Sequence, residues 1–269
     1  MKKGLDAYKI KIIALLFMIV DHVYKTFNAP VHGFQLGESW PQWIPVTTRF
    51  VAPVFLFLVI EGFYYTRSRG KFLLRLLVAE LVMTVGSIPV NYLVHKEDLL
   101  TGKMNFTSLI HIQGIFLSLA LSLAFIWCLE NVKQGKNRVL NIFLVIIVTA
   151  LSFLIGAGIY YLPFAFFMWL FRGRKGLMSL GIIAWCAVLL IQALHSYSVV
   201  TGAGAVITGG LYSHLCFDNE WGCFLVIPFI FLYNGERGKN TAFSKYLFYV
   251  FFPVHLWILE IARFIIFKQ

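Results

Sequence analysis

Apolar runs close to the length needed to cross a membrane recur from one end of the chain to the other. Short loops separate them, and none is long and polar enough to form a soluble domain. We therefore expect one membrane domain over residues 1–269, built as an all-α, polytopic helical bundle. The pattern predicts about nine transmembrane helices: 9–27, 49–66, 72–93, 108–129, 138–156, a shorter span before the loop at 172–176, then 176–196, 221–233 and 243–266.

Two segments need separate treatment. The first apolar run follows a short basic start and is not closed by a small-residue cleavage site, so we expect a retained span and not a signal peptide. Residues 198–216 are too short and too rich in glycine to cross the membrane. We expect an outer re-entrant or interfacial segment there.

Composition and charge agree with a membrane protein. Hydrophobic residues make up 59% of the chain and charged residues 13%, and the mean hydropathy is +0.79. The net charge of +11 would suit a nucleic-acid-binding protein, but most of the 23 lysines and arginines lie in alternate loops. This asymmetry follows the positive-inside rule and predicts a cytoplasmic N-terminus in a bacterial inner membrane.

The first apolar run carries an unusual pair, Asp21 and His22. A central Asp in a bilayer costs about 2.5–3.5 kcal/mol on insertion scales, so such residues usually mark a site or a pathway. Lys11 and His22 are about three helical turns apart and share a helix face, with roughly 16 Å between them. If Lys11 lies at the interface, His22 lies just past the midplane of a core ~30 Å thick, within reach of both sides.

Histidine is well suited to act as a general base near neutral pH. Asp21 points about 100° away from His22, so we expect its partner on a neighbouring helix. His255, in the last span, either brings a second imidazole into the site or packs beside Pro253.

Other polar residues lie inside or at the ends of the apolar runs. Glu61 is close to the inner interface, whereas Arg49 and Gln113 lie toward the outer one, near His111. For Arg49 and for Glu80, charge pairing between helices explains the residues as well as a site does. Cys216 and Cys223 flank a predicted outer loop, where they form either a disulfide or two unpaired thiols. No metal site is expected.

Four blocks of sequence resemble the TraX family, named for the enzyme that acetylates the N-terminus of the F-type conjugative pilin. They are the first apolar run with its Asp21–His22 pair, RFVAPVFLFLVIEGFYYTRSR at 49–69, YNGERG at 233–238 and KYLFYVFFPVHL at 245–256. The family often has Asp-Tyr-Gly before its middle helix, where this chain has Gly-Ala-Gly at 156–158.

A wider likeness concerns the first helix alone. Acyltransferase-three enzymes carry a basic residue, ten intervening residues and a catalytic histidine there, and Lys11 and His22 fit this spacing. The resemblance implies a transmembrane acyltransferase fold, with acetyl-CoA entering from the cytoplasm and the acceptor approaching from outside.

Together these features predict an acetyl-CoA-dependent membrane acetyltransferase with His22 as base, and Asp21, Glu61 and His255 as further catalytic candidates. The acceptor is an amine or hydroxyl of a protein N-terminus such as pilin, a glycan or a lipid headgroup. Basic residues on the cytoplasmic side are the candidates for binding the CoA phosphates, although setting the topology explains most of them equally well. These candidates are Lys11, Arg67, Arg69, Lys71, Arg172, Arg174 and Arg237, with Lys175 and Lys239 nearby.

Two other classes stay open. A proton-coupled secondary transporter would use Asp21, Glu61 and His255 as a proton relay. The absence of an internal repeat in the sequence counts against it. A scaffold for envelope assembly would need no catalysis, and it leaves the midplane histidine unexplained.

Overall fold

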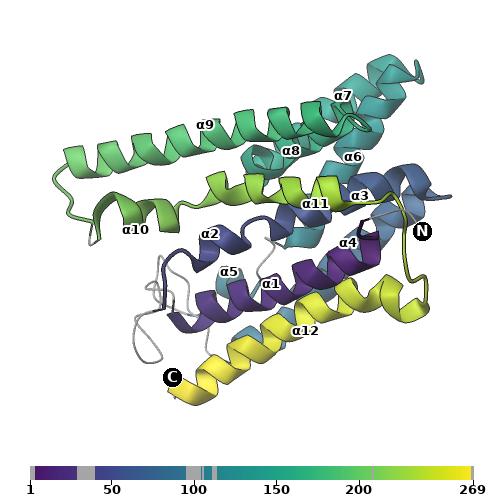
Figure 1. Cartoon of the computed structure of the whole chain (residues 1–269). Helices are drawn as coiled ribbons and strands as arrows, with labels where there is room; N and C mark the ends of the chain where they lie inside the picture. Colours follow the sequence, from purple (N-terminus) through teal and green to yellow (C-terminus); the bar gives the residue numbers. More distant parts are fainter. Residues whose placement is uncertain are drawn as a thin grey trace.

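The computed structural model describes residues 4–28, 40–94, 104, 106–110, 114–207 and 209–267. His111 and Gln113 lie outside this set. The described residues form a helical bundle that has no β-strand, only an isolated bridge between Leu5 and Tyr233. Figure 1 shows the chain termini at opposite ends of the bundle.

The helices follow in chain order, with η2 a 3-10 helix. They are α1 (Ala7–Asn28), α2 (Ile44–Thr48), α3 (Val51–Tyr65), α4 (Arg69–Leu93), α5 (Phe106–Leu109), α6 (Ile115–Lys133), α7 (Arg138–Leu154), α8 (Gly158–Leu170), α9 (Lys175–Gly202), α10 (Gly210–Phe217), η2 (Glu220–Val226), α11 (Ile227–Leu232) and α12 (Ala242–Phe267).

Five segments of the described chain are long and apolar enough to cross a membrane. They are α2 with α3, then α4, α6, α9 and α12. A sixth is added if α10 and the η2–α11 segment, which meet at a bend of 62°, form one broken span. The apolar helices α7 and α8 are shorter, and charged residues interrupt α1. The all-α membrane fold is therefore supported, while the number nine and the orientation remain predictions.

The expected re-entrant segment at 198–216 is divided between two helices. Its first residues extend α9 to Gly202, and α10 begins at Gly210, directly after Gly209; both glycines have positive φ. Figure 1 shows α10 and α11 running back along α9. The segment thus leads into a bent return path along α9, and a broken span and a re-entrant loop both fit this geometry.

The fourth span begins at Ile115, and not at residue 108 as predicted. Gly114 is extended, and the buried Glu80 carboxylate accepts hydrogen bonds from the backbone N–H groups of Gly114 (3.2 Å) and Leu117 (3.1 Å). A carboxylate at a helix N-terminus satisfies unpaired donors and interacts favourably with the helix dipole. Glu80 therefore has a structural role in positioning α6.

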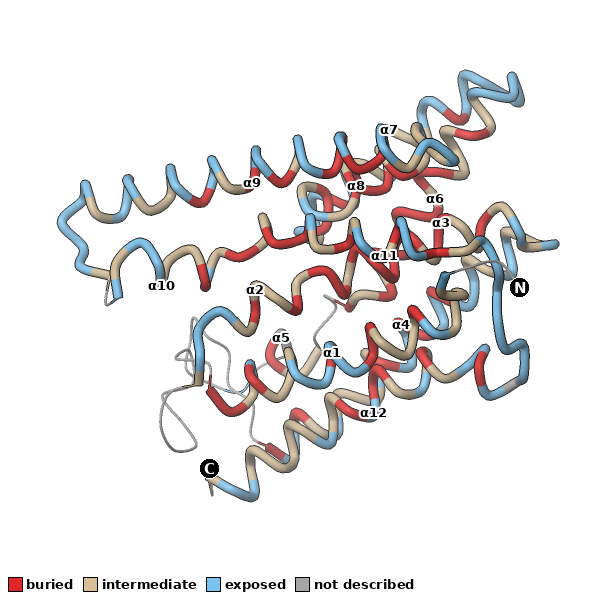
Figure 2. The backbone as a smooth tube through the Cα atoms, viewed as in Figure 1, coloured by how far each residue is buried: buried red, intermediate tan, exposed pale blue. Residues whose placement is uncertain are grey.

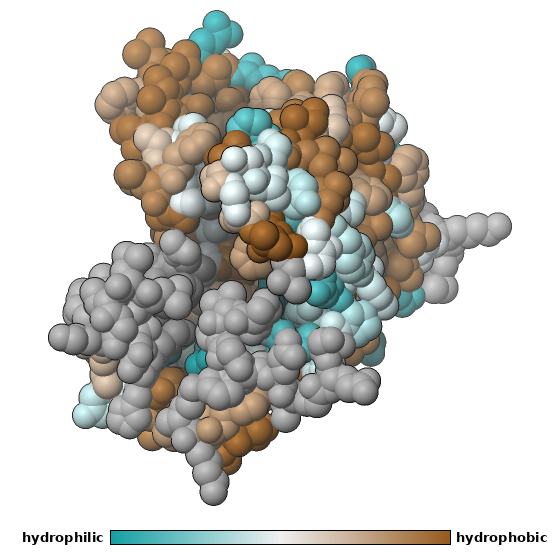
Figure 3. All heavy atoms as spheres, turned by 90° about the vertical axis from the view of Figure 1, so that its left-hand side faces the viewer, coloured by the Kyte–Doolittle hydropathy of each residue, from teal (hydrophilic) through white to brown (hydrophobic). Residues whose placement is uncertain are grey.

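Large apolar side chains cover the outside of the bundle. Exposed leucine, isoleucine, valine and phenylalanine residues line α4, α7, α9 and α12, while buried residues face inward (Figure 2). Figure 3 looks onto the end opposite the N-terminus and shows hydrophobic residues on the flanks and hydrophilic residues nearer the centre. A soluble protein rarely exposes so much contiguous apolar surface, so this belt is a lipid-facing surface.

Candidate functional site

A pair of histidines joins the first and last helices. Helices α1 and α12 pack together and run in the same direction from the N-terminal end (Figure 1). His22 Nδ1 lies 2.7 Å from His255 Nε2, and the ring centroids are 4.9 Å apart. His255 is buried and His22 is half-buried. His255 was expected either to join His22 or to pack beside Pro253, and in the structure its imidazole contacts His22.

Hydrogen bonding defines which nitrogens of this pair carry hydrogen. His255 Nδ1 lies 2.8 Å from the Phe251 carbonyl oxygen, which can only accept, so this nitrogen is the donor. In a neutral His255 ring, Nε2 then accepts, and His22 Nδ1 must donate to it. The hydrogen-bond chain therefore leaves the lone pair of neutral His22 on Nε2, where it can take up a proton.

Asp21 points to a different neighbour. Its carboxylate accepts a hydrogen bond from Thr48 Oγ1 at the end of α2 (2.7 Å) and forms an ion pair with Lys25 one turn further along α1 (2.7 Å). Asp21 thus links α1 to α2 and holds a negative charge next to His22 in sequence.

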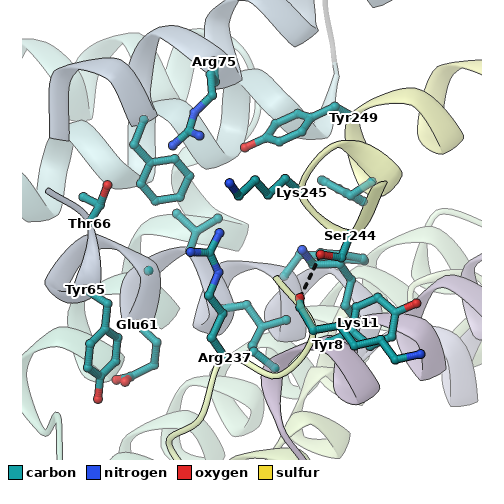
Figure 4. A pocket seen from close by; sticks show the side chains of 18 of the residues that line it. Tyr8, Lys11, Glu61, Tyr65, Thr66, Arg75, Arg237, Ser244, Lys245 and Tyr249 are labelled. Atoms are coloured by element: carbon teal, nitrogen blue, oxygen red, sulfur yellow. Dashed lines mark hydrogen bonds between the residues drawn. The ribbon is translucent and has the colours of Figure 1, made fainter. Parts of the chain in front are cut away.

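A cavity of about 370 Å³ opens at the N-terminal end of the bundle. Its walls come from the start of α1, the end of α3, the start of α4, the segment after α11, and the start of α12. Figure 4 shows Arg75, Arg237 and Lys245 pointing into the same space, together with the Tyr249 hydroxyl. The cationic side chains that line this cavity are Lys11, Arg75, Arg237, Lys239 and Lys245.

These five cations lack a carboxylate partner among the residues that the structure describes. Within the described residues none of them forms an ion pair, and the carboxylate that lines the cavity, Glu61, is paired with Arg172 instead. Several positive charges around one hollow attract a polyanion, and arginine side chains match phosphate geometry. The cavity therefore has the charge of a nucleotide- or phosphate-binding site.

The segment that follows α11 is fastened to the start of α1. Leu5 and Ala7 donate backbone hydrogen bonds to Leu232 (2.8 Å) and Glu236 (2.9 Å), and Asn234 donates to Leu5 (3.0 Å). These bonds place Arg237 and Lys239 over the cavity. Burial raises the pKa of Tyr233, which lines the cavity, to about 12, so its phenol stays neutral. At the other side, Ser244 donates to the Lys239 carbonyl (2.8 Å), the dashed line in Figure 4.

Glu61 does not approach the histidine pair. It lines the cavity with Lys11, and its carboxylate accepts two hydrogen bonds from Arg172 (2.9 and 3.2 Å). The Arg172 guanidinium also lies 3.9 Å from the centroid of Tyr64. Burial alone would lower the pKa of Arg172, but the hydrogen bonds and charge of Glu61 outweigh it and raise that pKa. The pair joins α3 to the end of α8.

Only some predicted phosphate-binding residues line the cavity. Lys11 and Arg237 do, while the remaining candidates lie elsewhere: Arg67, Lys71 and Arg174 are exposed, Arg69 stacks on Phe63 (4.1 Å), and Arg172 is paired. Sequence reasoning did not separate Arg75 and Lys245 from the topology-setting charges. Arg75 shares a helix face with Phe72 within the first two turns of α4, and Lys245 shares one with Phe248 at the start of α12. This position is the signal that would have found them.

The remaining polar residues hold helices together. Arg49 pairs with Glu220 of η2, and this ion pair borders a cavity of about 60 Å³. Cys216 and Cys223 are both free thiols, and the Cys223 thiol lies 3.7 Å from the Arg49 carbonyl oxygen. The expected choice between a disulfide and unpaired thiols is thus resolved in favour of thiols.

The fold and the site define a multi-pass membrane protein with a hydrogen-bonded histidine pair and a cationic cavity. The family model described as TraX protein matches residues 7–263, and the chain belongs to the TraX family. It is 23% identical over 270 residues to the "Probable fimbrial assembly protein FimC, serogroup H1" of Dichelobacter nodosus, with 98% of each chain covered. No solved structure matches the chain.

The Glu61–Arg172 pair can be tested as a structural link. We expect Glu61→Gln and Arg172→Gln each to lower stability by about 1–3 kcal/mol, because each leaves a partly buried partner unpaired. The double variant should lose less than the sum, since no uncompensated charge remains. Thermal unfolding of the purified protein in detergent measures this, and strictly additive losses would contradict the pairing.

Proposed function

We propose that this protein is a membrane acetyltransferase that moves an acetyl group from cytoplasmic acetyl-CoA to an acceptor at the outer side of the membrane. The arrangement of α1 carries the proposal: Lys11 lines the cationic cavity, and His22 lies on the same helix face, roughly 16 Å further along. One helix therefore connects a site for the donor with a site for the chemistry.

The cavity suits the donor. CoA carries several phosphates, and five cations without carboxylate partners among the described residues surround the hollow. The same end of the bundle carries most of the basic loops, which supports its placement on the cytoplasmic side. Tyr8, Tyr249 and Ser244 add neutral polar groups that can contact the nucleotide.

The histidine pair suits the chemical step. His22 Nε2 takes a proton from the acceptor amine or hydroxyl as that atom bonds to the acetyl carbonyl carbon. The carbon–sulfur bond then breaks and CoA leaves as the thiolate, which takes up the proton from His22 or from water. His255 contacts no reacting atom in this scheme. It is a positioning residue, because its Nε2 keeps the hydrogen of His22 on Nδ1.

The acceptor is proposed from the comparisons. The family name refers to a pilin-modifying protein, and the relative is named for fimbrial assembly. We infer that the acceptor is the N-terminal amine of a pilus or fimbrial subunit. Such an α-amine has a pKa of about 7.7–8.0, so a sizeable fraction is neutral and nucleophilic near neutral pH.

The proposal makes a prediction for the two histidines. We expect His22→Ala to lower the rate of acetyl transfer by about 10²–10⁴-fold, the usual contribution of a general base. His255→Gln should retain more activity than His255→Ala, because an amide oxygen can still accept from His22 Nδ1. The measurement is release of free CoA from acetyl-CoA by the purified protein with an N-terminal pilin peptide.

The matched control is His195→Ala, which changes an exposed histidine of α9 and should leave the rate unchanged. Full activity of His22→Ala would contradict the proposal. Substrate-driven proton uptake into vesicles without CoA would contradict it as well, and would favour the transporter with Asp21, Glu61 and His255.

A second prediction concerns the cavity. Arg75→Ala, Arg237→Ala and Lys245→Ala should each weaken CoA binding by about 10- to 100-fold in Kd, which corresponds to about 1.5–3 kcal/mol for a lost charge-assisted hydrogen bond. Lys136→Ala, on an exposed loop outside the cavity, is the matched control. Calorimetric titration with CoA at two salt concentrations measures the effect, and equal weakening in the control would show that only overall charge matters.

A further inference from the structure

Four buried phenylalanines separate the cationic cavity from the histidine pair. Phe55 of α3 and Phe248 of α12 line the cavity and stack with centroids 4.0 Å apart. Phe252 follows one turn along α12, with its centroid 5.9 Å from that of Phe248. Phe116 of α6 packs against both α12 rings, at 5.1 and 5.5 Å. All four are buried, and we call them the phenylalanine wall.

The histidine pair lies directly behind this wall, as seen from the cavity. The Phe252 ring meets His22 edge-on at 5.8 Å and His255 at 5.5 Å. On α1, the residues that share a face with Lys11 and His22 are Leu15 and Met18, and both are buried. The space between cavity and imidazoles is therefore filled by apolar side chains from α1, α3, α6 and α12.

A closed wall of this kind constrains any molecule that has to connect the two sites. The nucleotide of a thioester can stay with the cations, but its apolar arm and acyl group must pass Phe248 and Phe252 to reach His22. Helix backbones are packed on all sides, so room is made most easily by rotation of the rings and by the flexible Met18.

We propose that Phe248 and Phe252 form a gate between the cavity and the histidine pair, and that Phe252 sets the acyl chain length that reaches His22. This inference rests on the proposed function. Every added methylene has to fit beside the Phe252 ring, where close packing leaves no spare volume, and one methylene in such a site changes selectivity by about 10- to 200-fold.

The test compares acetyl-, propionyl- and butyryl-CoA as donors for the full-length protein in detergent, with the pilin peptide as acceptor. We expect Phe252→Leu to raise the ratio of kcat/KM for butyryl-CoA to that for acetyl-CoA by about tenfold or more. Phe248→Leu should raise the same ratio, and Phe252→Trp, which enlarges the ring, should lower it. Binding of CoA itself should stay within about twofold in the two Phe252 variants, because Phe252 does not line the cavity, and this shows that they are folded.

Phe164→Leu is the matched control, because Phe164 is equally buried but lies on α8 beside the small cavity at Arg49. It should keep the wild-type ratio. Active variants with unchanged ratios, or a control that shifts the ratio equally, would overturn the gate while leaving the proposed function in place. A wild-type protein that neither binds CoA nor releases it from any thioester would overturn both.

Discussion

The proposed chemistry depends on the hydrogen bond between His22 and His255. Two imidazoles in an apolar bundle are stable only if their nitrogens are satisfied, and here the Phe251 carbonyl begins a chain that determines both tautomers. This bond joins the first helix to the last, so residues 233 positions apart form one site. An imidazole without this hydrogen bond would be free to rotate, whereas the His22 ring presents its Nε2 in a defined direction.

The rest of the bundle holds the charged side chains around the site in defined places. Positive side chains gather around the cavity at the N-terminal end, and Glu61 is held by Arg172. Apolar side chains fill the space between the cavity and the imidazoles. The Asp21 carboxylate accepts a hydrogen bond from Thr48 and forms an ion pair with Lys25. Excluding water from such a region strengthens electrostatic effects on a reacting thioester and prevents its hydrolysis. Under the proposed function, the apolar packing between the cavity and the imidazoles serves to exclude water from the reaction.

Local geometry made part of this predictable from the sequence. Helical periodicity alone placed Lys11 and His22 on one face and turned Asp21 toward another helix, because both follow from neighbouring residues on α1. The choice among cations was not predictable: Arg75 and Lys245 line the cavity because α4 packs against α12, and α12 packs against α1. The Glu61–Arg172 pair joins residues 111 positions apart, and the start of α6 depends on Glu80 of another helix. Such contacts arise from tertiary packing, and the hydropathy pattern of the sequence does not predict them.

The most direct test is an experimental density map of the protein with a non-transferable thioether analogue of acetyl-CoA. The proposed function predicts that the phosphates contact Arg75, Arg237 and Lys245. The acetyl-like tip should lie within hydrogen-bonding distance of His22 Nε2, with the Phe252 ring turned aside. A nucleotide bound away from these cations, or a tip that ends in the cavity while His22 remains enclosed by Phe252, would contradict it.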